Sequence, residues 1–135
     1  MFKKLMVAID GSEISMKALM EATRIAVSHH ATLRIVYVVS DSEHTDQEAG
    51  PKLLAQATSA VGDGVDTETR VLHADAMYGL NGIAETIANA ANEWSADLVV
   101  VGSSHRQGLE RWVIGSVAEQ LIAKVDASIL LVRPH

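Results

Sequence analysis

The sequence predicts an α/β fold with a single doubly wound, mostly parallel five-stranded sheet in the order 3-2-1-4-5 and helices on both faces. Short apolar runs alternate along the chain with segments whose apolar residues recur at helical spacing, which is typical of parallel sheets. The runs at 5–9 and 98–101 contain no polar residue, as expected of strands buried on both faces. Right-handed crossovers between parallel strands favour the stated order.

The amino-terminal half is expected to contain three strands and two helices. The strands are expected at residues 5–9, 33–39 and 67–72, and the last alternates polar and apolar residues as a half-exposed edge strand does. The first helix is expected to end near His29, and its apolar residues are Ile14, Ala18, Ala22 and Ile25. Pro51 is tolerated in the first turn of the second helix, which follows a polar, acidic loop at residues 40–50.

The carboxyl-terminal half is expected to contain two helices and two strands. Asn81 is expected to cap the third helix, whose apolar residues are Ile83, Ile87, Ala90, Ala91 and Trp94. After the strand at 98–101, Ser116 and Glu119 have the spacing of a capping box, which predicts that Ser116 is the N-cap of the fourth helix. The apolar residues of that helix are Val117, Leu121, Ile122 and Val125. The final strand is expected at Ile129–Val132.

Composition and charge narrow the classes of function. Hydrophobic residues make up 48% of the 135 residues, and no linker or repeat interrupts them, so one domain spanning residues 1–135 is expected. The formal net charge of −6 disfavours nucleic acids and anionic membranes as partners, since both require a basic surface. The chain has no cysteine and no apolar run long enough for a signal or membrane-spanning segment, so we expect a cytoplasmic protein.

The six histidines are scattered along the chain without the spacing of a zinc site, so no metal site made of protein side chains is expected. Five of them are expected at the surface, namely His29, His30, His44, His73 and His135. The sixth, His105, is a candidate functional residue because it lies in the glycine-bearing segment from Gly102 to Ser116.

The segment from Gly102 to Ser116 is the most informative in the chain. It is expected to join the carboxyl end of a buried strand to the start of a helix through a loop that contains glycines. Backbone N–H groups in such a loop, together with the helix dipole, favour an anion, typically a phosphate. Ser103 could donate a hydroxyl hydrogen bond, and Arg106 would either screen phosphate charge or lie solvated at the surface.

A second turn is expected beside this segment. In the predicted order the winding reverses between the first and fourth strands, and ligands of such sheets bind at the carboxyl ends of the strands at that point. Asp10 ends the first strand and Gly102 follows the fourth, so we expect them to flank a crevice. The Asp10 carboxylate could accept hydrogen bonds from ribose hydroxyls or an adenine amino group, or from the backbone of its own turn.

Apolar residues near the crevice have more than one interpretation. Val38 and Val39 end the second strand and would form a wall for an adenine ring, or would be ordinary core. Trp112–Ile114 is expected in the loop, where the indole would cover the crevice, join a partner surface or pack beneath the loop.

Four stretches of the sequence resemble the universal stress protein family, and the resemblance covers essentially the whole chain. They are Met6–Ser12, Asp97–Ser103, Gly115–Glu119 and Ser128–Arg133. The resemblance implies an α/β domain that dimerises and a role in the stress response. It also implies, as in many members of that family, ATP bound through the pattern G-x2-G-x9-G-[S/T].

Carried onto this chain, the pattern has its first glycine at Gly102 and its final pair at Gly115 and Ser116, whereas His105 occupies the position of the second glycine. The His105 ring could donate to a phosphate or block the pocket, and Gly108 could supply part of the missing flexibility. We therefore expect an ATP site, with Mg²⁺ accompanying the phosphates, made of Ala8, Asp10, Val38, Val39, Gly102, Ser103, His105, Arg106, Gly108, Gly115, Ser116 and Val117.

Two functions compete at this point. The leading hypothesis is a regulatory protein of the stress response that binds ATP, and the alternative is a dimeric interaction protein that binds no nucleotide because of His105. Catalysis is expected to be absent or limited to slow ATP hydrolysis, since no G-K-[S/T] sequence occurs. Under both hypotheses a homodimer is expected through the strand Ser128–Val132, because an apolar edge strand needs a cover.

Overall fold

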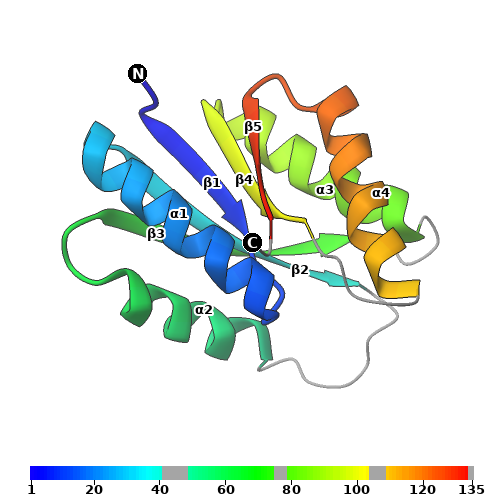
Figure 1. The fold of residues 1–135 in the computed structure, drawn as a ribbon, viewed down its shortest axis with the longest axis horizontal. Coiled ribbons are helices and arrows are strands. Elements are labelled where there is room, and N and C mark those ends of the chain that lie inside the picture. Colours follow the sequence, from blue (N-terminus) through cyan, green and yellow to red (C-terminus); the bar gives the residue numbers. More distant parts are fainter. Residues whose placement is uncertain (41–48, 75–78, 104–108, 134–135) are drawn as a thin grey trace.

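The computed structural model describes residues 1–40, 49–74, 79–103 and 109–133, with the backbone alone for residues 40, 79–81 and 109–116. These residues form a five-stranded parallel sheet in the order β3-β2-β1-β4-β5. Helices α1 and α2 cover one face of the sheet, and α3 and α4 cover the other (Figure 1). The predicted fold class and strand order are thus confirmed.

Strands and helices alternate along the chain as predicted. The strands are β1 (Lys4–Ala8), β2 (Thr32–Ser40), β3 (Asp66–Ala74), β4 (Leu98–Gly102) and β5 (Ser128–Val132). The helices are α1 (Glu13–His29), α2 (Ala49–Val61), α3 (Gly79–Trp94) and α4 (Leu109–Lys124). No helix in the described part of the chain is long and apolar enough to cross a membrane.

The core consists of two apolar layers, one on each face of the sheet. Leu5 and Val7 of β1 belong to the layer under α1 and α2, and Met6 belongs to the layer under α3 and α4. All three side chains are completely buried. The uninterrupted apolar run therefore marks a strand buried on both faces, as expected of the central strand of a parallel sheet.

Helix α1 is closed at both ends by local contacts. At its start, Ser12 is the N-cap, and its Oγ accepts a hydrogen bond from the Ser15 backbone N–H at 3.2 Å. At its end, His30 adopts a left-handed conformation with φ of 54°, which stops the helix. His29 is half-buried, because its Nδ1 accepts from the Phe2 N–H at 3.1 Å and the two rings stack. His29 is therefore only partly exposed at the surface and joins the amino terminus of the chain to the end of α1.

Two helices begin earlier than predicted. Helix α3 begins at Gly79, so Asn81 lies inside the helix and does not cap it. Helix α4 begins at Leu109, so Ser116 lies inside the helix and the predicted N-cap is wrong. Trp112–Ile114, expected in a loop, also lies within α4. Serine followed three residues later by glutamate is not confined to helix starts, since serine also occurs within helices.

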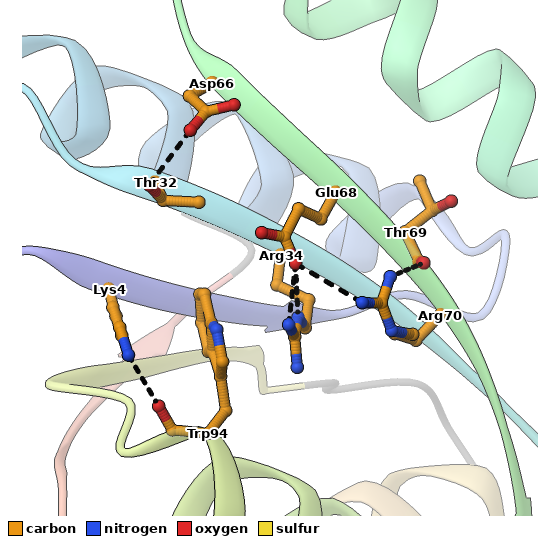
Figure 2. Close-up of polar contacts among 8 residues, drawn as sticks. All are labelled: Lys4, Thr32, Arg34, Asp66, Glu68, Thr69, Arg70 and Trp94. Carbon is orange, nitrogen blue, oxygen red and sulfur yellow. Dashed lines mark hydrogen bonds and ion pairs between the residues drawn. The ribbon is translucent and has the colours of Figure 1, made fainter.

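A cluster of charged and aromatic side chains covers one face of the sheet near the amino ends of the strands. Arg34 of β2 is only 16% exposed, and its Nε and Nη2 donate to Glu68 Oε1 of β3 at 3.0 and 2.6 Å. Its guanidinium lies 4.2 Å from the centre of the Trp94 ring, and Lys4 Nζ lies 5.6 Å from it. Figure 2 shows the indole between the two cations. This cluster joins three strands to the end of α3.

Candidate functional site

A cavity of about 320 Å³ opens at the carboxyl ends of β1, β2 and β4. Its walls come from β1 and the turn that follows, from the ends of β2 and β4, and from α1, α3 and α4. Strands β1 and β4 are neighbours in the sheet although they are distant in sequence. The cavity therefore lies where the winding of the sheet reverses, which is where the crevice was expected.

The structure brings together some of the expected site residues. Those that line the cavity are Ala8, Asp10, Val38, Gly102 and Val117. Val39 and Ser103 do not line it, although both belong to described segments. The Ser103 N–H donates to the Val132 carbonyl at 2.7 Å, so this backbone donor is already paired.

The remaining expected residues are in or before α4. Gly115 and Ser116 lie inside α4, where backbone N–H groups pair within the helix. A helix start at Ser116 would have left the N–H groups of these two residues free to bind a phosphate. The described backbone does not have this arrangement, because both residues lie within α4. His105, Arg106 and Gly108 lie outside the described residues.

Asp10 organises the turn after β1. Its Oδ1 accepts from the Ser12 N–H at 2.9 Å, as in the turn interpretation of this residue. Ser15 Oγ donates to the Ser12 carbonyl at 3.0 Å and accepts from the Asp10 N–H at 3.2 Å. Asp10 is exposed at the rim of the cavity. Because a carboxylate accepts several hydrogen bonds, the turn contact leaves capacity for a ligand donor.

Gly102 permits close packing between β4 and α1. A Cβ at this position would lie 2.9 Å from Ile14 Cγ1 and 3.0 Å from the Ile14 carbonyl oxygen. Both distances are shorter than normal van der Waals contact, and a backbone oxygen cannot rotate away. The glycine is thus needed to hold two walls of the cavity together, a requirement that exists without any ligand.

Sequence reasoning missed several lining residues. Tyr37 of β2, Ser15 of α1 and Ile83 and Ile87 of α3 line the cavity. Ser12 lines it too, but Ser12 belongs to the turn after β1 that was expected to flank the crevice. The two isoleucines have helical spacing, which indicates a buried face but does not distinguish core from cavity wall. The strand order could have identified the two isoleucines as cavity residues, because α3 connects β3 to β4 and must therefore pass over β2 and β1 beside the crevice.

The chemistry of the lining is mixed. Aliphatic side chains from both faces of the sheet form most of the walls, and Asp10 is the only charged residue among the described lining residues. Apolar walls suit a flat ring, and a carboxylate at the rim suits hydroxyl or amino donors. Within the described segments no three His, Cys, Asp or Glu residues are grouped so that they could hold a metal ion.

Comparisons with known proteins agree on one family. The family model of the universal stress protein family matches residues 1–133. Universal stress protein YxiE of Bacillus subtilis is 30% identical over 155 residues, which cover 98% of this chain and 100% of that protein.

Solved structures show the same likeness. A universal stress protein crystallised in complex with cAMP has a TM-score of 0.74 and 25% identity, covering 97% of this chain and 96% of its own. The universal stress protein of Archaeoglobus fulgidus in complex with dAMP has a TM-score of 0.72 over 97% and 98% of the two chains, and its 21% identity is evidence of the fold alone. This chain therefore belongs to the universal stress protein family.

Proposed function

We propose that the crevice binds an adenine nucleotide and that the protein acts as a regulatory domain of the stress response in the cytoplasm. The observation that carries the proposal is the cavity of about 320 Å³ at the point where the sheet winding reverses. Its volume is at the lower end of the range of small-molecule pockets. The relative crystallised with cAMP, which shares the fold, supports an adenine nucleotide as the ligand class.

The lining indicates how a nucleoside would lie. The base would lie at the carboxyl end of β2, between Tyr37 on the α2 side of the sheet and Val38, Ile83 and Ile87 on the α3 side, and the ribose hydroxyls would donate to Asp10 at the rim. The phosphates would then extend towards the residues that follow Gly102. The described residues thus fit the nucleoside part of the ligand.

We further propose ATP as the physiological nucleotide, supported by the match of Gly102, Gly115 and Ser116 to the pattern G-x2-G-x9-G-[S/T] through which many universal stress proteins bind ATP. Mg²⁺ would be held mainly by the phosphates and water, since it keeps several waters and needs few protein ligands. The competing hypothesis of a protein without nucleotide binding rests on His105. Replacing it with glycine separates the two: a gain of ATP affinity supports the competing hypothesis, and an unchanged or lower affinity supports ours.

Titration calorimetry with ATP, AMP and cAMP tests the proposal. Val38→Phe adds volume at a half-buried cavity wall and is expected to weaken binding by at least about tenfold. Val27→Phe is the matched control, because Val27 is 52% exposed on α1 and does not line the cavity. Absence of binding at millimolar nucleotide, or equal affinity in wild type and Val38→Phe, would refute the proposal.

We also propose a homodimer through β5. This strand lies at the edge of the sheet. Leu131 on β5 is 38% exposed, and Ile122 on α4 is 66% exposed. An antiparallel β5 from a second copy would pair the free backbone groups of the edge and cover apolar surface.

A further inference from the structure

A buried glycine of α2 lies directly behind one wall of the crevice. Gly50 is the second residue of α2 and is buried. A Cβ at this position would lie 3.0 Å from Cδ2 and 3.3 Å from Cε2 of Tyr37. Tyr37 in turn lines the cavity beside Val38. The tyrosine ring therefore packs against the α2 backbone at the one point where that backbone carries no side chain.

The requirement for glycine at this position is steric. Gly50 does not have a positive φ, unlike Gly11 and Gly62. In a helix, glycine is less favourable than alanine, so helix formation does not explain its presence. The close approach of Tyr37 does explain it, because even a methyl group would require the ring to move.

The surroundings of the ring determine where it could move. Tyr37 pairs with Val71 in the β2–β3 register, and the same Cβ at Gly50 would lie 3.5 Å from Val71 Cγ2. The ring thus has α2 behind it and β3 beside it. Tyr37 also lines the cavity, so we expect a larger residue at position 50 to push the ring towards the cavity.

We infer that Tyr37 determines the size of base that the crevice accepts and that Gly50 is its positioning residue. This inference rests on the proposed nucleotide site. With glycine at position 50 the Tyr37 ring packs against the α2 backbone, away from the base, and leaves room for an unsubstituted adenine. The ring then limits the crevice on the β2 side and excludes adenines that carry a bulky group.

Graded substitution at position 50 tests the positioning role with AMP as the probe. Gly50→Ala is expected to raise the Kd for AMP about threefold and Gly50→Val about tenfold, because each displaces the ring further. Gly64→Ala is the control, since a Cβ there meets no atom within 4 Å. In the double variant Gly50→Val with Tyr37→Val, the Kd is expected to return to that of Tyr37→Val alone. Urea unfolding of each variant shows whether it stays folded under the binding conditions, so that weaker binding is not mistaken for unfolding.

Base-substituted analogues test the specificity role. Tyr37→Val is expected to bind N6-benzyl-AMP or 8-benzylamino-AMP about tenfold better, relative to AMP, than wild type does. If wild type binds AMP but Gly50→Val binds it equally well, or if neither analogue gains from Tyr37→Val, the inference is wrong and the nucleotide site stands. If wild type binds no adenine nucleotide, the proposed function fails and this inference fails with it.

Discussion

At the scale of single residues, Asp97 shows how one carboxylate fixes the start of a central strand. Its Oδ2 accepts from the backbone N–H groups of Lys3 and Lys4 at 2.8 and 2.9 Å. These two hydrogen bonds, and secondarily the charge of Lys4, hold the pKa of Asp97 below its ordinary value of 3.8. The carboxylate therefore joins the beginning of β1 to the turn that precedes β4.

The lowered pKa of Asp97 predicts a pH-dependent contribution to stability. A carboxyl whose pKa is lower in the folded state stabilises the fold above its unfolded-state pKa, and the contribution is lost as the pH falls through the folded-state pKa. The Asp97→Asn variant is thus expected to be less stable than wild type at neutral pH, and the difference is expected to shrink below about pH 4. Urea unfolding of both proteins between pH 7 and pH 3 measures it. A difference that is unchanged at acidic pH would contradict this assignment.

Gly102 leads to a second prediction at the residue scale. Gly102→Ala is expected to lower the free energy of unfolding by about 1–3 kcal/mol, because its Cβ would overlap Ile14. Gly64→Ala has open space around its Cβ and is expected to change stability little or to raise it slightly. Urea unfolding compares the two variants. Equal stability of Gly102→Ala and wild type would show that the contact with Ile14 relaxes at no cost.

At the scale of elements, α3 holds the end of α4. Asn92 Nδ2 donates to the Lys124 carbonyl at 3.1 Å, and Asn92 Oδ1 accepts from the Asp126 N–H at 3.0 Å. A terminal carbonyl of α4 and an amide of the connection to β5 thus find partners on a neighbouring helix. Helix ends leave such groups unpaired unless a side chain or water satisfies them.

The Asn92 contact can be tested by removing its donor and acceptor in steps. Asn92→Ala is expected to cost about 1 kcal/mol of unfolding free energy, and Asn92→Asp, which sets a carboxylate oxygen against the Lys124 carbonyl at the carboxyl end of α4, is expected to cost at least as much. Glu93→Ala, at the exposed neighbouring position, is the control for changes in helix propensity. Thermal and urea unfolding measure all three. An Asn92→Ala variant as stable as Glu93→Ala would contradict the role of this contact.

The elements also show why the sequence predicted some boundaries and missed others. The strands were predictable because runs such as the one at 5–9 are apolar without interruption, and α1 ends at His29 as expected. The start of α4 was not predictable from Ser116, because the side-chain pattern of a cap also fits the interior of a helix. The N-cap at Ser12 was missed, although serine there is a common helix start.

At the scale of the whole molecule, the predicted strand order was enough to locate the crevice, but it did not identify most of the residues that line it. Asp10 and Gly102 were predictable because they lie at the carboxyl ends of two strands that the order places side by side. The roles of Gly50 and Gly102 depend on how closely a helix approaches a strand, and a single sequence carries no signal for that distance. Tyr37 and Ile87 were missed because apolar residues at regular spacing indicate burial, whether core or cavity lies beyond.

The edge strand β5 gives a prediction at this scale. If two copies pair through β5, Leu131→Lys is expected to shift the protein from dimer to monomer, because lysine at the edge cannot be covered without desolvation. Val27→Lys changes an exposed valine on α1 and is expected to leave the dimer intact. Light scattering coupled to gel filtration measures the mass of each variant. A monomeric wild type would contradict the proposed dimer.

Chemical-shift mapping by NMR with an adenine nucleotide shows directly whether the crevice is the nucleotide site. We expect backbone amide shifts to change along the cavity lining, at 8–15, 37–38, 83–87, 101–102 and 117–118, and to remain unchanged at the amino ends of the strands, at 4, 32, 66 and 98. Saturable changes confined to the first group would identify the crevice as the binding site. Changes centred on the second group, or none at millimolar ATP, AMP or cAMP, would contradict it.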